Sequence, residues 1–354
     1  MTSVKVSVNL KVFFQYKLLL FFAKTNVCPL LTEKIFPRSG PRYFFLNLLV
    51  AITSHKYLKV SYNTSRSKYH LHNSGDVTIK YFSSIPPSKS ILRLDGIGFE
   101  SYEGEKRKQY VHTMNELVNK SHALIFQSNF SKSIFQDFYS DLILSKPHTV
   151  ITNGSSQLSS SINKRKLQKS YNIYLPDKFF VVAGRNVPRK RINLIIDLFK
   201  SLPQYNLVVL SDVSSNFFEY PNIYPLGILP PGIARYIISI STALIHVDTY
   251  DWCPNIVVNA LYDGASIICS NYGGTPEIVR KSCNNHFIIQ EHHTHSDTFD
   301  YMCNLSSAKF PLDLFYDALD KAYNKQTINL TSQYEFSIDY SAFNYSSFIQ
   351  GLSC

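Results

Sequence analysis

The sequence has few of the features that mark a membrane-spanning, secreted or metal-binding protein. Its six cysteines form no Cys-x-x-Cys pair and no spacing typical of metal ligands, which favours free thiols in a reducing compartment over a disulfide framework. The apolar run at residues 18–23 lies between two lysines and is too short to cross a bilayer. A buried strand is therefore favoured over a signal peptide there. We expect a cytoplasmic protein without a metal site.

Charged residues are also scarce, at 17% of the chain, which excludes a disordered polyelectrolyte. The net charge of +11 is spread along the chain and is not held in one tail. A basic surface without a specific partner explains it as well as an anionic substrate, nucleic acid or an anionic membrane face does. No nucleic-acid motif accompanies the charge, so we expect no nucleic-acid partner. Peripheral contact with an anionic membrane stays open.

The length of 354 residues favours two domains of about 150 to 180 residues. No solenoid-type repeat is present, and short apolar runs alternate with segments of helical periodicity, which indicates βαβ units and parallel sheets. Buried strands are predicted at residues 91–94, 123–128, 149–152, 178–184, 205–211, 243–247 and 266–270. The polar segment 153–170 is the best candidate linker. The pattern predicts two doubly wound α/β domains, with ligands at the carboxyl ends of the strands.

Three loops of the second half follow predicted strands, and each has groups that suit a diphosphate. The first is residues 184–191, GRNVPRKR. Gly184 permits a sharp turn, and the cations that follow suit phosphoryl oxygens: Arg185, Arg189, Lys190 and Arg191. A solvated basic turn is the alternative interpretation.

The second loop, residues 248–255 (DTYDWCPN), enters a predicted helix that starts near Pro254. A helix N-terminus attracts phosphate through its free N–H groups and partial positive charge. Asp251 could cap this helix or accept hydrogen bonds from sugar hydroxyls. Local sequence does not favour one over the other.

The third loop is residues 271–279, NYGGTPEIV. Gly273 and Gly274 permit close approach of the backbone to a ligand. Thr275 is predicted to cap the following helix, with Pro276 at its first position.

In this order, the loops resemble the C-terminal half of the retaining nucleotide-sugar glycosyltransferases of family 4, which have the GT-B fold. In that family a strand ends in G-R-x-x-x-x-K, which Gly184, Arg185 and Lys190 match. A later turn reads G-G-x-P-E, which residues 273–277 match, and Cys-Pro-Asn after an acidic residue recurs in one branch. The resemblance covers about residues 178–280. It implies a metal-independent enzyme whose donor is a UDP- or GDP-sugar.

The resemblance also implies roles for individual residues. Arg185 and Lys190 would neutralise the diphosphate leaving group, and Asp251 would hold hydroxyls of the donor sugar. Preorganised cations and N–H dipoles stabilise such a leaving group without a metal. Gly40 would approach the donor, and the backbone at Pro254, Asn255 and Ile256 would bind its sugar or phosphates. Further candidates for contact with the donor are Gly184, His246, Asn259, Gly273, Gly274 and Thr275.

The first half resembles the family less closely. Residues 39–49 resemble the glycine loop and first helix that face the donor phosphates, and residues 336–350 resemble the helix that crosses back to the first domain. Asp95 stands near the place of a histidine that often follows the middle strand. It is a candidate for orienting the acceptor, and a structural role in a turn is an equal alternative.

The main departure from the family is Asn259, where a glutamate accepts hydrogen bonds from the donor ribose. The amide oxygen of asparagine can also accept, but it is shorter and uncharged. His246 ends a predicted strand and could touch the donor, although a lone histidine is more often a core residue. His292, His293 and His295 lack acidic or cysteine neighbours, which favours a solvated loop.

We therefore expect a GT-B protein with an acceptor-binding domain at residues 1–165, a donor-binding domain at 166–335 and a crossing helix at 336–354. The predicted function is retaining transfer of a hexose to a glycan, lipid or protein acceptor. A pseudoenzyme that binds sugar nucleotides or glycans without turnover is the alternative, because of Asn259.

Overall fold

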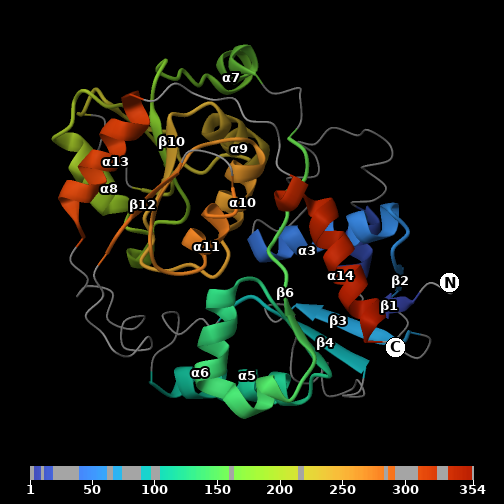
Figure 1. The fold of residues 1–354 in the computed structure, drawn as a ribbon. Helices are drawn as coiled ribbons and strands as arrows, with labels where there is room; N and C mark the ends of the chain where they lie inside the picture. Colours follow the sequence, from blue (N-terminus) through green and yellow to red (C-terminus); the bar gives the residue numbers. More distant parts are fainter. Residues whose placement is uncertain are drawn as a thin grey trace. The chain divides into compact units, whose positions relative to one another are not determined.

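The computed structural model describes residues 4–8, 12–18, 40–61, 67–73, 89–96, 104–158, 163–213, 219–282, 286–291, 310–324 and 334–352. The chain divides into two compact units (Figure 1). Unit 1 comprises Met1–Ser156 and Tyr334–Cys354, and unit 2 comprises Gln157–Gln333. Among the described residues, no helix combines the length and apolar character needed to cross a membrane.

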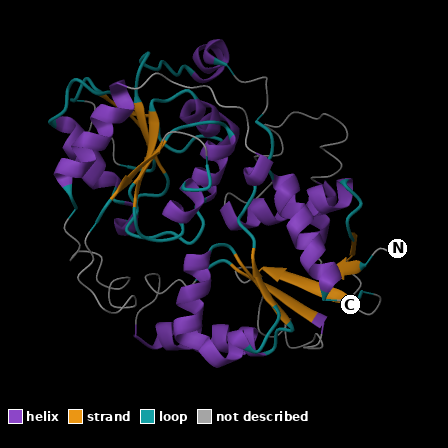
Figure 2. Ribbon diagram, in the orientation of Figure 1, coloured by secondary structure: helices purple, strands orange, loops and turns teal. Residues whose placement is uncertain are grey.

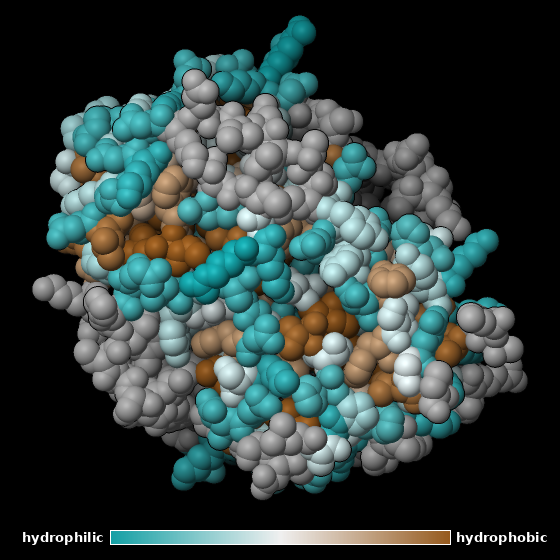
Figure 3. Space-filling model, viewed as in Figure 1, coloured by the Kyte–Doolittle hydropathy of each residue, from teal (hydrophilic) through white to brown (hydrophobic). Residues whose placement is uncertain are grey.

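Each unit is built on a six-stranded sheet in which all neighbouring strands pair in parallel. Helices flank both sheets (Figure 2). Hydrophilic side chains cover much of the face in Figure 3, with apolar side chains visible between them. The prediction of two doubly wound α/β domains is therefore confirmed, and it follows from strands that are apolar because both of their faces are covered.

The sheet of unit 1 has the order β2-β1-β3-β4-β5-β6. Its strands are β1 (Lys5–Ser7), β2 (Lys59–Ser61), β3 (Tyr69–Asn73), β4 (Ser90–Leu94), β5 (Ala123–Phe126) and β6 (His148–Val150). One side of the sheet packs in a shared apolar core with α3 (Gly40–Ser54) and α14 (Ile338–Gly351). Further described helices of this unit are α5 (Gly104–Asn119), α6 (Asn129–Leu144) and a helical segment at residues 12–18.

Helix α14 belongs to unit 1 although it is far from the other elements in sequence. Its side chains Ala342, Tyr345 and Ile349 are completely buried in the core that contains α3. The segment before it pairs with the chain after β6, because Ser155 donates its N–H to Phe336 O at 2.7 Å. Residues 334–352 therefore complete the core of unit 1.

The strand predicted at residues 18–23 needs correction, whereas the predicted linker does contain the boundary between the two units, between Ser156 and Gln157. Residues 12–18 are helical and bury Tyr16, so the strand predicted at 18–23 does not form at its one described residue, and the rest of that run lies outside the described residues. The predicted linker is ordered at both ends of its described part. Asn153 and Ser155 are buried, and α7 (Lys164–Tyr171) is helical.

The sheet of unit 2 has the order β12-β11-β10-β7-β8-β9. Its strands are β7 (Phe180–Ala183), β8 (Leu207–Leu210), β9 (Ile223–Pro225), β10 (Ala243–His246), β11 (Ile267–Ser270) and β12 (His286–Ile289). Its helices are α7, α8 (Ile192–Lys200), α9 (Pro231–Ser239), α10 (Asn255–Tyr262), α11 (Thr275–Val279) and α13 (Leu312–Asn324). From β7 the chain adds β8 and β9 on one side, and it then crosses to the other side of β7 to add β10, β11 and β12. The direction in which strands are added to the sheet therefore reverses between β7 and β10. Sheets of this type bind ligands at the carboxyl ends of the strands beside that reversal.

One buried histidine makes the stability of unit 1 sensitive to pH. Burial, and to a smaller extent the charge of His70, lower the pKa of His72 to about 3. The unfolded chain binds a proton near pH 6.5 and the folded chain does not. The contribution of neutral His72 to the free energy of unfolding is therefore fully present above pH 6.5 and is lost as the pH falls toward 3. The loss is about 2 kcal/mol at pH 5.

The measurement is amide exchange of β3 and β4 between pH 7 and pH 5, corrected for the intrinsic exchange rate. Between pH 7 and pH 5 the free energy of opening of these strands should fall in the wild-type protein. It should fall by about 2 kcal/mol less in His72→Leu. His112→Gln changes a histidine whose side chain is 74% exposed and should behave as the wild type. Equal losses in the wild type and His72→Leu would contradict the assignment.

Candidate functional site

The loops after β7 and β10 lie against each other at the reversal of unit 2. The first contains a short 3-10 turn, η3 (Pro188–Lys190), and the second runs from Val247 to Pro254. Thr249 donates its N–H to Arg189 O at 2.8 Å, which fixes one loop to the other. The two loops singled out from the sequence, residues 184–191 and 248–255, therefore meet at the edge of the sheet where a ligand is expected.

Two cations and two carboxylates form one cluster in these loops. Lys190 Nζ lies 2.7 Å from Asp248 Oδ2 and 3.7 Å from Asp251 Oδ2. Arg189 Nη1 lies 3.5 Å and 3.3 Å from the same two atoms. Burial would raise the pKa of Asp251, but the charges of Lys190 and Arg189 hold it below its ordinary value. Asp251 is therefore ionised at neutral pH.

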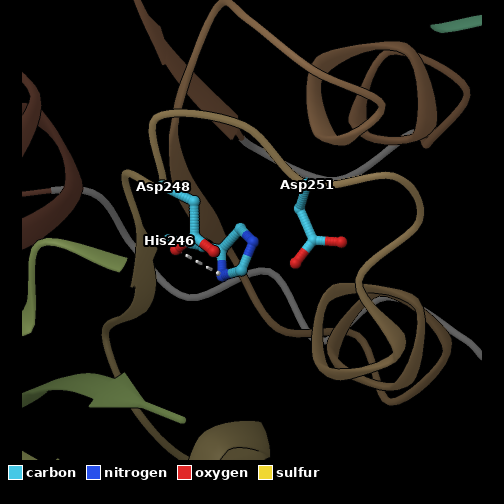
Figure 4. A group of neighbouring side chains, drawn as sticks. All are labelled: His246, Asp248 and Asp251. Carbon is cyan, nitrogen blue, oxygen red and sulfur yellow. Dashed lines mark ion pairs between the residues drawn. The ribbon is translucent and has the colours of Figure 1, made fainter. Parts of the chain in front are cut away.

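His246 lies beside both carboxylates (Figure 4). Its side chain is buried at the end of β10, and its Nδ1 is 3.6 Å from Asp248 Oδ1. Burial lowers its pKa, so the ring is neutral at physiological pH. Among the described residues, none forms a hydrogen bond with its Nε2. A buried polar atom of this kind is costly unless a bound molecule satisfies it.

His246, Asp248 and Asp251 have the residue types and proximity of a metal site, because their ligand atoms lie within 4.8 Å of one another. Lys190 and Arg189 already pair with both carboxylates. A divalent cation would have to displace these side chains or lie beside their positive charges. The donor set therefore fits a divalent cation poorly and a phosphate-bearing ligand better.

Two glycines allow the cluster to be compact. Gly184 has φ +134°, and a Cβ there would lie 3.1 Å from Cδ of Lys190. Gly273 has φ +89°, and a Cβ there would lie 2.8 Å from Asp251 N. Gly274 donates its N–H to Asp251 O at 2.7 Å. The close approach that Gly273 permits is thus to the backbone of the Asp251 loop.

The N-terminus of α10 follows the cluster directly. Its cap residue is Pro254, so Asp251 does not cap this helix. Asp251 Oδ2 faces Arg189 and Lys190 instead. Asn255, Ile256 and, one turn later, Asn259 are all half-buried in this helix.

The expected cap on α11 is wrong. Gly274 is the cap residue, α11 begins at Thr275, and Pro276 is its second residue. Thr275 is buried, and none of the described residues forms a hydrogen bond with its Oγ1. The tight turn at Gly273 brings the backbone of Gly274 against Asp251, which leaves Gly274 in the cap position.

Arg185 is not a member of the cluster. Arg185 is exposed and its charge acts on Asp212, whose carboxylate accepts the N–H of Asn186 at 2.7 Å. In unit 1, Gly40 is the first residue of α3. His292, His293 and His295 lie outside the described residues.

Asp95 follows β4 in unit 1 and is held by two side chains. It accepts hydrogen bonds from Nη1 of the fully buried Arg93 and, at 3.1 Å, from Gln127 Nε2. Arg93 Nη2 also donates to Asn153 Oδ1 at 2.8 Å. Asp95 is therefore a carboxylate held in place, with the positive charge of Arg93 beside it.

Two members of the cluster, Arg189 and Asp248, were not singled out from the sequence. Arg189 was recognised as one of four cations, but not as the one that contacts both carboxylates. Asp248 comes two residues after the end of β10, and this position was its only signal. Which cation of a basic loop points inward depends on the η3 turn, which local sequence does not fix.

No family model and no curated protein sequence matches the chain. Solved structures match it, among them Anabaena HepE in complex with UDP, at 16% identity over 86% of this chain and 82% of that chain, with a TM-score of 0.52. Sucrose-phosphate synthase of Thermosynechococcus elongatus matches at 12% identity over 90% and 80%, with a TM-score of 0.55. The fold is GT-B. WaaG, a glycosyltransferase involved in lipopolysaccharide biosynthesis, shares this GT-B fold at 10% identity over 90% and 96%, with a TM-score of 0.56.

Proposed function

We propose that the protein is a glycosyltransferase that moves a hexose from a UDP- or GDP-sugar to a glycan, lipid or protein acceptor, with retention of configuration. The cluster of Arg189, Lys190, Asp248 and Asp251 at the reversal of the sheet carries this proposal. It lies where nucleotides bind in doubly wound sheets and beside the N-terminus of α10. HepE, a structural match, binds UDP and UDP-glucose. Retention and membership of family 4 rest on the sequence resemblance.

The chemistry of the cluster suits departure of a nucleoside diphosphate. Negative charge grows on the diphosphate as the sugar leaves, and Lys190 and Arg189 are already held in place to stabilise it. The paired carboxylates keep the cations from moving, and Asp251 would exchange part of this pairing for hydroxyls of the sugar. His246 Nε2 and Thr275 Oγ1 are further buried polar atoms that a donor would satisfy.

The fixed carboxylate of unit 1 is proposed to orient the acceptor. Arg93 balances the charge of Asp95, so this carboxylate is suited to accepting a hydrogen bond from an acceptor hydroxyl more than to removing its proton. Gly40, at the start of α3, is proposed to approach the donor, as the resemblance implies.

A non-catalytic protein that binds sugar nucleotides is the alternative, and Asn259 is the observation behind it. The charges around Lys190 favour turnover, because these groups would act on the leaving group and not on the ribose. A thermal-shift screen with UDP- and GDP-sugars, followed by assays of transfer and hydrolysis, tests the two. Stabilisation by a donor together with sugar release is expected. Tight binding without transfer or hydrolysis of any donor would overturn the enzyme.

Replacing Asn259 by Glu is expected to strengthen binding of the donor nucleotide about tenfold, because a charged acceptor forms the stronger hydrogen bond with ribose hydroxyls. Calorimetric titration with UDP and GDP measures it. Gln168→Glu, on the exposed side of α7, adds the same charge elsewhere in unit 2 and should have no effect. A neutral or harmful result for Asn259→Glu would show that the pocket binds the nucleotide differently.

A further inference from the structure

Arg191, the residue after Lys190, forms a buried ion pair with Glu291. Arg191 Nη1 lies 2.7 Å from Glu291 Oε1, and Nη2 lies 2.9 Å from Oε2. The two side chains are only 7% and 2% exposed. Two parallel charge-assisted hydrogen bonds fix both the distance and the orientation of the partners.

The backbone of Arg191 is in the left-handed region, with φ +50° and ψ 25°. This conformation is uncommon for residues other than glycine and costs free energy. Arg191 both ends η3 and precedes the first turn of α8, so the strained residue sets where the basic loop turns into the helix. The ion pair with Glu291 holds the residue in this conformation.

The pair also joins the loops that build the charged cluster. Arg191 Nη1 donates to Val247 O at 3.3 Å, and Val247 directly precedes Asp248. On the other side, Glu291 donates its N–H to Asn271 Oδ1 at 3.0 Å, in the loop after β11. Lys190 is therefore the chain neighbour of Arg191, and Asp248 is the chain neighbour of Val247, which Arg191 contacts.

We propose that Arg191 and Glu291 are positioning residues, which hold Lys190 and Asp248 at the spacing that binds the diphosphate. The inference rests on the proposed function. Glu291 occupies both Nη atoms of Arg191 inside the protein, so this guanidinium is not directed at the phosphate as Lys190 is proposed to be. Loss of the carboxylate would leave a buried cation unpaired and would release the loop that bears Lys190.

The test compares two variants that each break a buried, two-pronged pair in unit 2. Glu291→Gln breaks the pair with Arg191, and Asp263→Asn breaks the pair with Arg235, in which the distances are 2.9 and 2.6 Å. Asp263 follows the far end of α10 from the cluster. Affinity for UDP and GDP is measured by calorimetry at a temperature at which each variant is folded, and amide exchange is measured at Thr249.

Glu291→Gln should bind the nucleotide at least about tenfold more weakly than the wild type and should exchange Thr249 faster. Asp263→Asn should match the wild type in both. Arg191→Gly, which suits the backbone conformation and removes the side chain, should behave like Glu291→Gln. Asn172→Gly, at an exposed residue with φ +52°, is its matched control and should be unchanged.

Wild-type affinity and wild-type protection of Thr249 in Glu291→Gln would overturn the inference. A wild-type protein that binds neither UDP nor GDP would instead overturn the proposed function. In that case the exchange of Thr249 still decides whether the pair holds the two loops together.

Discussion

Replacing Lys190 by Ala is expected to lower the rate of sugar transfer about 10²- to 10³-fold, the effect typical of removing one preorganised group that stabilises transition-state charge. Two effects act in the same direction. The variant loses the cation nearest to Asp248, and it leaves the carboxylates of Asp248 and Asp251 less neutralised beside the incoming diphosphate. The measurement is kcat/KM for the donor that the screen identifies.

Lys321→Ala is the control for this substitution. Lys321 pairs with Asp317 at 2.7 Å on the surface of α13, with a side chain that is 62% exposed. Its removal should leave kcat/KM unchanged, because an exposed ion pair contributes little. Turnover of Lys190→Ala at the wild-type rate would remove Lys190 from the site.

The second large effect is expected at Gly273. Gly273→Ala should lower the free energy of unfolding of unit 2 by about 2–4 kcal/mol and weaken nucleotide binding more than tenfold. The new Cβ would lie 2.8 Å from Asp251 N and 3.0 Å from Asp251 O at a residue with φ +89°. Backbone atoms cannot rotate away, so the loop that bears Asp251 must move.

Gly227→Ala separates the clash from the backbone strain. Gly227 has φ +70°, but among the described residues no heavy atom beyond its chain neighbours lies within 4 Å of a Cβ placed there, so about 1–2 kcal/mol of backbone strain is expected alone. Unfolding can be followed by fluorescence of the single tryptophan, Trp252, which adjoins Asp251. Equal losses in the two variants would show that contact with Asp251 is unimportant.

The parts of the fold that the sequence predicted are those that depend on short segments. Apolar runs such as Phe180–Ala183 and Ala243–His246 predicted parallel strands because burial on both faces requires them. The loops after these strands could then be assigned to one edge of a sheet. Local patterns were misleading where packing decides the conformation, as at Leu18, which is helical in place of the predicted strand, and where a turn sets the cap, as at Thr275.

The site was predictable only in part for a related reason. Lys190 and Asp251 were found because a motif marks each of them. Glu291 pairs with Arg191 across 100 residues of sequence, and nothing near either residue signals the other. The pairing follows from the order of the strands, which brings the ends of β7, β10, β11 and β12 together. Arg189 and Asp248 became part of the site in the same way.

The place of α14 in the core of unit 1 has a consequence during translation. The strands up to β6 leave the ribosome well before Ala342, Tyr345 and Ile349 are made, by an interval on the order of 10 to 40 s at ordinary elongation rates. Unit 2 is synthesised within that interval and can fold first. During this interval the apolar side of α3 that α14 later covers is exposed to solvent. The nascent first unit is therefore the part of the chain that a chaperone would need to shield.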